Sequence, residues 1–321
     1  MPKVFAIGEA LIDFIPKEKG IKLSKVTAFE KLLGGAPANV VSAVAKLGGE
    51  SAFIGKIGID AFGEFILSSL QEIGVDTSYI SRTEQAKTML AFVSLQKDGE
   101  RDFMFYRNPS ADMLLHEDEI KKEWFQKGDV LHFCSVSLIE APIKYAHKKA
   151  ITAIKEQGGT VSFDPNVRLP LWENSEDCRK TIIEFIPLSN ILKISEEELP
   201  FITGIKDKKR AIQTLFTGEV EVILYTKGAK GAELYTKDFN LEVSGIKVNA
   251  IDTTGAGDAF MGGFLYKIFS EKMGITNLTQ EKAFEAVAFA NKVAALSTTR
   301  KGAVKSFPSS RSRWLLPAHI K

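Results

Sequence analysis

The chain has 321 residues, 45% of them hydrophobic, which is enough to bury a full core without a disulfide or a structural metal. Its 42 basic and 40 acidic residues are mixed along the sequence and leave a formal charge of +2, which excludes the broad basic surface that nucleic acid requires. The two cysteines, Cys134 and Cys178, form no CxxC pair, which argues against a zinc site and favours a reducing compartment.

The amino terminus is apolar from Met1 to Pro16, but Glu9 and Asp13 interrupt it, so we do not expect a signal peptide. No stretch approaches the ~18 apolar residues of a membrane span. We therefore expect a cytoplasmic protein that binds small molecules, with neither nucleic acid nor a membrane as a partner.

Short apolar runs rich in β-forming residues alternate along the chain with longer amphipathic segments. The spacing of Ile143, Ala146, Ala150, Ile151 and Ile154 predicts a helix over 142–159, which ends at a pair of glycines. The runs that we interpret as buried parallel strands are 4–8, 130–135, 161–164, 191–195 and 222–226. This alternation predicts an α/β fold with helices on both faces of one sheet.

Two segments break the alternation. Residues 11–33 have an extended pattern, and Met89 to Tyr106 have the pattern of an apolar hairpin around an Asp-Gly turn. We expect these segments to form a small second sheet that projects from the main body and covers a cleft as a lid. An ordinary extension of the main sheet is the alternative.

Polar residues follow several of the predicted strands. Ligands of open parallel sheets bind beyond the carboxyl ends of the strands, so we expect these residues to face one cleft. They are Asp13, Asp164 with Asn166, Ser195 with Glu198, and Thr226 with Gly228.

Two glycine-rich stretches add candidate binding loops. In GGAPANVVSAVAKLGG, residues 34–49, a diglycine opens a helix of small residues and lets Asn39 come close to a ligand; tight packing against a strand is the alternative. In VILYTKGAKGAEL, a strand ending at Thr226 leads into Gly228 and Gly231, a turn whose amides are able to hold phosphate oxygens. Glycine turns between strands are common, so this second pattern is weak by itself.

The stretch IDTTGAGDAF, residues 251–260, precedes a predicted helix. Glycines on either side of Ala256 let an anion approach the unpaired amides of the helix start. Asp258 would repel a resting phosphate, which favours a proton acceptor beside the anion; a simple helix cap is the alternative. Phe260 replaces the third glycine of a dinucleotide fingerprint, and no Walker A loop occurs. An anion hole, a carboxylate and a second glycine turn together indicate phosphoryl transfer to an alcohol.

The pair GGAPANV and DTTGAGDAF, in this order, resembles the two signatures of the ribokinase or PfkB family of carbohydrate kinases, and the likeness spans nearly the whole chain. FYRNPSADMLL, from Phe105, and FDPNVRLPLW, from Phe163, are more similar to fructokinases than to ribokinases or adenosine kinases. The resemblance implies one three-layer ribokinase-like domain over 1–321, with a central, mostly parallel sheet flanked by helices. It also implies a discontinuous β lid at 11–33 and 88–108.

The resemblance implies roles for residues at the acceptor end of the cleft. Asp258 is expected to take the proton from the sugar hydroxyl. The amides expected to stabilise the transferred phosphoryl group are those of Gly255, Ala256 and Gly257. The residues expected to bind the sugar are Asp13, Gly34, Gly35 and Asn39, with Arg107 and Arg168 near the acceptor or its phosphate.

The resemblance also implies sites for ATP and for cations. The residues expected to hold ATP are Ser195, Thr226, Lys227, Gly228, Gly231 and Asn291. Those expected to surround a monovalent cation such as K⁺, mostly through carbonyl oxygens, are Asp252, Thr254, Ser297, Arg300, Gly302 and Ser306. Many family members carry an NxxE pattern that organises Mg²⁺; here Ser195 takes the asparagine position, and we expect Glu198 to bind Mg²⁺ through water.

The function that this resemblance implies is ATP-dependent phosphorylation of D-fructose at its terminal hydroxyl, giving fructose 6-phosphate. A kinase for 2-keto-3-deoxygluconate or ribose is one alternative, and a non-catalytic sensor of sugar or nucleotide is an alternative from another class. Because an exposed apolar hairpin is a natural association surface, we also expect a homodimer formed through the lid.

Overall fold

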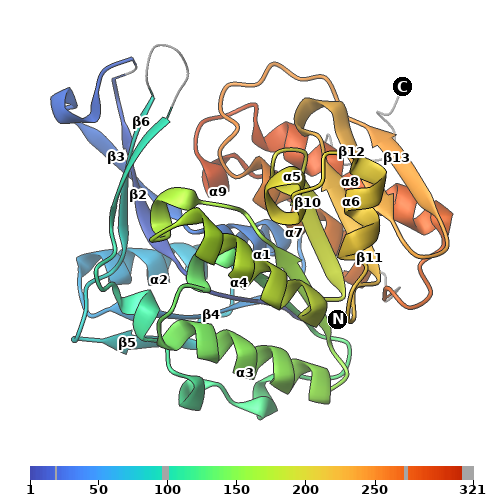
Figure 1. Ribbon diagram of the computed structural model, residues 1–321. Helices are drawn as coiled ribbons and strands as arrows, with labels where there is room; N and C mark the ends of the chain where they lie inside the picture. The colour runs from blue at the N-terminus through green and yellow to red at the C-terminus, as the bar shows by residue number, and fades with distance from the viewer. Residues whose placement is uncertain (19, 96–100, 271–273, 313–321) are drawn as a thin grey trace.

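The computed structural model describes residues 1–18, 20–95, 101–270 and 274–312. Within them the main sheet has the strand order β13-β12-β11-β10-β9-β8-β1-β4-β5 (Figure 1). Neighbours from β5 to β11 pair in parallel, and β12 and β13 are added antiparallel. The strands are β1 (Val4–Ile7), β4 (Ser51–Gly58), β5 (Ile80–Thr83), β8 (Val130–Cys134), β9 (Thr160–Asp164), β10 (Ile191–Ser195), β11 (Val222–Thr226), β12 (Gly231–Tyr235) and β13 (Asn240–Ser244).

The predicted strands and the predicted crossover helix are confirmed. The apolar runs form β1, β8, β9, β10 and β11, and the amphipathic segment forms α3 (Pro142–Glu156), which ends shortly before Gly158. Gly158 has φ +75°, a left-handed conformation that favours glycine after a helix. The remaining helices are α1 (Ala36–Lys46), α2 (Ala61–Ile73), α4 (Ser175–Phe185), α5 (Glu198–Thr203), α6 (Lys208–Leu215), α7 (Ala256–Ser270), α8 (Gln280–Ser297) and α9 (Ala303–Ser306).

Helices cover both faces of the main sheet, as the alternation of strands and helices predicts. Alternate residues of one strand point to opposite faces, so Leu131 and Phe133 of β8 pack in the cluster that contains α3, α4, α5 and α6. Val130 lies in the cluster on the other face, with residues of α1, α7 and α8. The sheet is therefore the middle of three layers, which confirms the predicted fold class.

The second sheet is separate from the main one, with strand order β3-β2-β6-β7. Its strands are β2 (Leu11–Pro16), β3 (Phe29–Gly34), β6 (Leu90–Leu95) and β7 (Arg101–Tyr106), and β2, β3 and β6 project from the body in Figure 1. Phe14 stacks on Phe92, with ring centroids 4.7 Å apart, and meets Phe62 of α2 edge-on at 5.7 Å. This aromatic contact ties the second sheet to the body. The predicted Asp-Gly turn between β6 and β7 lies outside the described residues.

The helices are those of a globular α/β protein. None of them, in the part of the chain that the structure describes, combines the length and apolar character that a membrane crossing needs.

Candidate active site

The first turn of α7 forms the centre of the site. Gly255 precedes the helix with φ +75°, and a Cβ there would lie 2.7 Å from the Cβ of Ala303, so both the backbone conformation and the space require glycine. The amide of Ala256 donates to the carbonyl of Thr253 at 3.2 Å, which closes the turn before the helix. The positive end of the helix dipole points out of this turn, as the predicted anion site requires.

Asp258 lies in the same turn and is buried. Its Oδ2 accepts a hydrogen bond from Nδ2 of Asn39, at 2.8 Å, because α1 packs against α7. The side-chain oxygen of Asn39, Oδ1, is buried and has no donor among the described residues. Leaving a buried acceptor without a hydrogen bond costs free energy, so this position is suited to a ligand whose hydroxyl group donates a hydrogen bond to it.

Asp13 of β2 belongs to the same cluster of polar groups. A Cβ on Gly34 would lie 2.2 Å from Oδ2 of Asp13, so the absence of a side chain at position 34 makes room for the carboxylate. Gly35 has φ +102°, and a Cβ there would lie 2.4 Å from the carbonyl oxygen of Glu9. Burial and the charge of Asp258 raise the pKa of Asp13 to about 7, against the opposing charge of Arg168. These two carboxyls therefore interact electrostatically.

The two predicted arginines differ in their surroundings. Arg168 is exposed, and its charge lowers the pKa of both Asp13 and Asp258, so it lies within electrostatic range of both carboxyls. Arg107 is buried and donates to Asp112, at 2.9 Å, and to the carbonyl of Val136, at 2.8 Å. The guanidinium of Arg107 is thus held by protein groups in the interior, whereas that of Arg168 is exposed and donates to the carbonyl of Val167 at 3.0 Å.

A cavity of about 510 Å³ adjoins the first turn of α7 and brings together the glycine turn after β11 and the glycine motif at the start of α7, whereas the stretch 34–49 does not line it. Apolar side chains such as Ile246, Val248 and Phe260 line much of it. Gly231 has φ +103°, and a Cβ there would lie 2.2 Å from the carbonyl oxygen of Val243, so the turn after β11 needs glycine. The predicted ATP and phosphate residues that line this cavity are Thr226, Gly228, Gly231, Ala256, Gly257 and Asn291.

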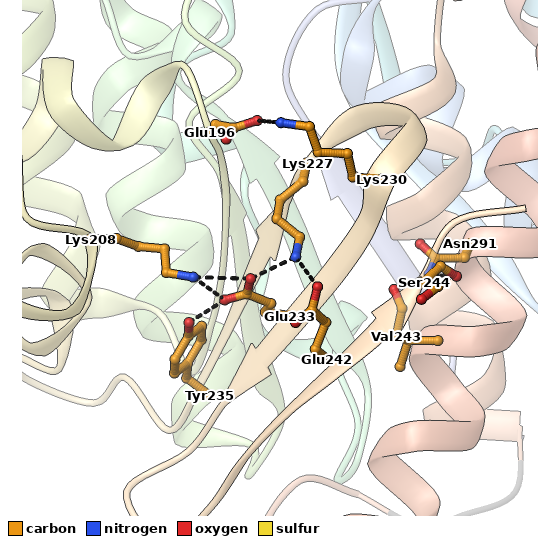
Figure 2. Close-up of polar contacts among 10 residues, drawn as sticks. All are labelled: Glu196, Lys208, Lys227, Lys230, Glu233, Tyr235, Glu242, Val243, Ser244 and Asn291. Carbon is orange, nitrogen blue, oxygen red and sulfur yellow. Dashed lines mark hydrogen bonds and ion pairs between the residues drawn. The ribbon is translucent and has the colours of Figure 1, made fainter.

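The side chains of two residues predicted to bind ATP, Lys227 and Asn291, contact other groups of the protein. Figure 2 shows the ammonium of Lys227 between Glu233 and Glu242, at 2.7 and 2.5 Å. Asn291 Nδ2 donates to the carbonyls of Val243 and Ser244, at 3.1 and 3.3 Å, and so ties α8 to β13. The ammonium of Lys227 is thus held by two carboxylates, and Lys227 does not line the cavity, although its neighbours Thr226 and Gly228 do.

Ser195 and Glu198 form a reciprocal cap at the carboxyl end of β10. The amide of Ser195 donates to Oε2 of Glu198 at 2.8 Å, and the amide of Glu198 donates to Oγ of Ser195 at 3.2 Å. Burial would raise the pKa of Glu198, but the charge of Lys193 and the backbone hydrogen bonds lower it, so the group stays ionised. Within the described residues no cluster of three or more His, Cys, Asp or Glu side chains is arranged to hold a metal. A carboxylate oxygen is nevertheless the donor that Mg²⁺ prefers.

The predicted cation residues come from two loops that the structure brings together. Asp252 accepts from the amide of Thr254 at 2.9 Å through Oδ1, and from the amide of Gly302 at 2.9 Å through Oδ2. The hydroxyls of Ser297 and Ser306 donate to carbonyls within their own helices. Arg300 lies near enough for its charge to lower the pKa of Lys46. The carbonyl oxygens of these loops are the groups suited to a monovalent cation.

Two buried charged residues of the site escaped the sequence analysis. Glu9 follows β1, and its carboxylate accepts from the Ser137 hydroxyl at 2.6 Å and from the amide of Ala36 at 3.3 Å. Lys193, within β10, forms an ion pair with Asp164 at 2.8 Å. The sequence feature that could have indicated Lys193 is its position in the middle of the apolar run ILKIS.

Comparisons with known proteins identify the family. A family described as pfkB family carbohydrate kinase matches residues 1–310. The chain belongs to this family of carbohydrate kinases. The Arabidopsis thaliana protein named "Probable fructokinase-5" is 45% identical to this pfkB family member over 309 residues, which cover 96% of this chain and 95% of that protein. The predicted resemblance is confirmed, and membership of a kinase family favours an enzyme over a non-catalytic sensor.

Solved structures of pfkB-like kinases have the same fold. A fructokinase from Xylella fastidiosa with bound ATP has a TM-score of 0.88 and 37% identity, over 95% of each chain. A double mutant of fructokinase from Vibrio cholerae O395, with fructose, ADP and a potassium ion bound, has a TM-score of 0.87 and 38% identity, over 96% of each chain.

Proposed function

We propose that this carbohydrate kinase transfers the terminal phosphoryl group of ATP to D-fructose and forms fructose 6-phosphate. The observation that carries the proposal is the pairing of Asp258 with Asn39 at the start of α7, where the side-chain oxygen of Asn39 lacks a donor among the described residues. A sugar hydroxyl is able to supply that hydrogen bond. The names of the relatives and the fructose bound in the Vibrio cholerae structure support this acceptor over 2-keto-3-deoxygluconate or ribose.

Asp258 acts as the base of the proposed reaction. Its carboxylate takes the proton of the terminal hydroxyl while that oxygen bonds to the γ-phosphorus, and the bond between the γ-phosphorus and the bridging oxygen breaks to release ADP. The amides of Gly255, Ala256 and Gly257, at the positive end of α7, stabilise the transferred group. Asp13, Gly34, Gly35 and Asn39 position the sugar, and Arg168 adds positive charge beside it.

The cavity of about 510 Å³ is the proposed ATP site, with the turn at Gly228 and Gly231 beside the phosphates and Asn291 in its wall. The ATP bound in the Xylella fastidiosa structure supports this assignment. Mg²⁺ held on the phosphates, with Glu198 as its partner through water, would neutralise negative charge there. The loops around Asp252 and Gly302 would bind a monovalent cation, which the potassium ion of the Vibrio cholerae structure supports.

The four-stranded sheet is the proposed lid of the site. It would exclude water from the transferred phosphoryl group, since Asp13 and Gly34 connect it directly to the polar cluster. We also propose that the whole chain functions as one domain in the cytoplasm, as a homodimer formed through this sheet.

The direct test is ADP release from ATP and Mg²⁺ across fructose, glucose, mannose, ribose, adenosine and 2-keto-3-deoxygluconate. Fructose is expected to give the highest kcat/KM. A clear preference for another acceptor would overturn the substrate assignment but keep the chemistry. The absence of ADP release with every acceptor would instead favour a sensor.

A further inference from the structure

Lys193 is a charged residue in the middle of the main sheet. It is the third residue of β10, its side chain is only 8% exposed, and its ammonium lies 2.9 and 2.8 Å from the two carboxylate oxygens of Asp164. Removing both charges from water costs free energy that their mutual attraction often fails to recover, so a buried ion pair is weak evidence for stability. Its presence calls for another explanation.

The ammonium of Lys193 packs against the first turn of α7. A Cβ added to Gly257 would lie 3.3 Å from Nζ and 3.8 Å from Cε of Lys193, so the lysine uses the space that this glycine leaves open. Cations stabilise the carboxyl end of a helix, and the amino end is already positive. The charge of Lys193 therefore does not stabilise α7 itself. For an anion bound at the amino end of α7, however, the positive charge of Lys193 adds to that of the helix dipole.

The charges around Asp258 come from several elements. Burial raises the pKa of Asp258 above its ordinary value, and the hydrogen bond from Asn39 and the charges of Lys193 and Arg168 offset that rise only in part. Burial would likewise lower the pKa of Lys193, but Asp164, Glu198 and Asp258 outweigh burial and raise it, so Lys193 stays protonated. The groups that face Asp258 are Asp13 from β2, Asn39 from α1, Cys134 from β8, Asp164 from β9, Arg168 from the loop after β9, and Lys193 from β10.

We propose that Lys193 is a positioning residue for phosphoryl transfer, whose buried ammonium adds positive charge at the first turn of α7, between Asp164 and Gly257. There it attracts the terminal phosphoryl group of ATP and favours the ionised form of Asp258 beside it. The inference rests on the proposed function, because it assigns Lys193 to the same reaction.

The test removes both charges at once, so that neither is left buried and unpaired. The double variant Lys193→Met with Asp164→Asn is compared with Lys193→Arg, which keeps the positive charge. The matched control is Lys56→Met with Glu119→Gln, which removes an ion pair of 2.6 Å between β4 and a segment away from α7. For each protein we would measure kcat against pH, the thermal midpoint, and the affinities for ADP and for a non-hydrolysable ATP analogue.

We expect the double variant at Lys193 to lose about 10²-fold in kcat, the size of effect seen when one stabilising group is removed from a transition state. Its preference for the ATP analogue over ADP should fall severalfold. The acidic limb of kcat should move to higher pH, because Lys193 lowers the pKa of Asp258 whereas Asp164 is not among the groups that shift it. Lys193→Arg should keep that limb near its original position. The control pair should keep all three properties.

Three outcomes would overturn the role of Lys193. They are an unchanged kcat, an unchanged preference for the ATP analogue over ADP, and a loss of kcat that the control pair reproduces with the same drop in thermal midpoint. The ratio of the affinities for the ATP analogue and for ADP is measured without sugar and without turnover. A wild-type chain that phosphorylates no acceptor would thus refute the proposed function, while the ratio would still decide whether Lys193 acts on the terminal phosphate.

Discussion

The pKa of the Asp258 carboxyl group depends on neighbours that act in opposite directions. Burial raises its pKa, while Asn39, Lys193 and Arg168 lower it. Burial outweighs these neighbours, so the pKa of Asp258 lies above its ordinary value, and the neighbouring donors and cations limit the rise. A base must be ionised before it accepts a proton, so these neighbours favour the form that the proposed base needs.

Replacement of the proposed base, Asp258, should slow the reaction without unfolding the protein. Asp258→Asn keeps the shape of the side chain, so we expect a folded protein that binds ATP normally but has a kcat lower by about 10²- to 10⁴-fold. Asp207→Asn is the matched control, because Asp207 also lies at a helix start and accepts from the amide of Arg210 at 2.8 Å, but does so at α6. ADP release and ATP titration on both variants would check this. Turnover near the wild-type rate in Asp258→Asn would contradict the assignment of the base.

Sequence motifs identify some residues of the site better than others. Asp258 and Gly255 lie in one short motif, and the glycines of this motif already indicate the backbone conformation that it needs. The hydrogen bond from Asn39 to Asp258 joins positions 219 residues apart, and only the packing of α1 on α7 creates it. Lys193 was missed because a single lysine in an apolar strand gives no indication of its partner. The pairing of Arg107 with Asp112 was missed for the same reason.

At the scale of elements, Glu233 of β12 joins β11 and β12, which flank the turn that lines the cavity proposed to bind ATP. Its carboxylate accepts from Lys227 at the end of β11, from Lys208 of α6, and from the hydroxyl of Tyr235 (Figure 2). Burial would raise the pKa of Glu233, but these three hydrogen bonds outweigh it and lower the pKa to about 2. The cluster therefore fixes the strand pair on either side of the turn at Gly228.

The low pKa of Glu233 predicts how stability depends on pH. A carboxyl with a lowered pKa stabilises the folded state fully above its ordinary value of 4.5, and this contribution is lost as pH falls from there to about 2. We expect Glu233→Gln to lower the free energy of unfolding by about 1–3 kcal/mol at pH 7. The difference from wild type should shrink between pH 4.5 and 2.

Urea unfolding of both proteins at several pH values would measure this difference. Glu72→Gln, at an exposed position of α2, is the control and should leave the free energy of unfolding unchanged. We also expect Glu233→Gln to raise KM for ATP without changing KM for the sugar, because Lys227 immediately precedes the turn beside the nucleotide. A difference from wild type that stays constant from pH 7 to pH 2 would contradict the assigned role of the charge.

The elements differ in how far their sequence predicts them. VLHFC is buried along its whole length and VILYT is buried up to Tyr225, and both lack glycine, so the apolar pattern predicts them as strands. β4 was missed because Gly55 and Gly58 interrupt its apolar run. A Cβ on Gly55 would lie 2.5 Å from the ring of Phe53, so packing, not strand propensity, selects the glycine. The strand order, with β1 between β4 and β8, depends on long-range pairing that no local pattern contains.

At the scale of the whole molecule, the parallel sheet brings the site together. Asp164, Ser195 and Thr226 end β9, β10 and β11, so all three meet at one edge of the sheet. This convergence was predictable, because it follows from parallel pairing alone. The attachment of the second sheet through Phe14, Phe92 and Phe62 was not, since it depends on side chains from three separate elements.

The second sheet also leaves an apolar surface at its edge. β7 is the last strand in the order β3-β2-β6-β7, and Met104 and Tyr106 on it are 43% and 56% exposed. Large apolar side chains on an edge strand favour association with another chain. We therefore expect a homodimer in which β7 of each subunit lies at the interface.

Met104→Glu tests this arrangement, because it places a charge where the proposed interface excludes water. Light scattering coupled to size exclusion should give a dimer mass for the wild type and a monomer mass for Met104→Glu at micromolar concentration. Phe284→Glu is the matched control, since Phe284 is 50% exposed but belongs to α8, which packs on β12 and β13 of the main sheet, and it should remain a dimer. A wild type that is monomeric at every concentration would refute the dimer. Dissociation by Phe284→Glu instead of Met104→Glu would move the interface from the second sheet to the α7 and α8 face.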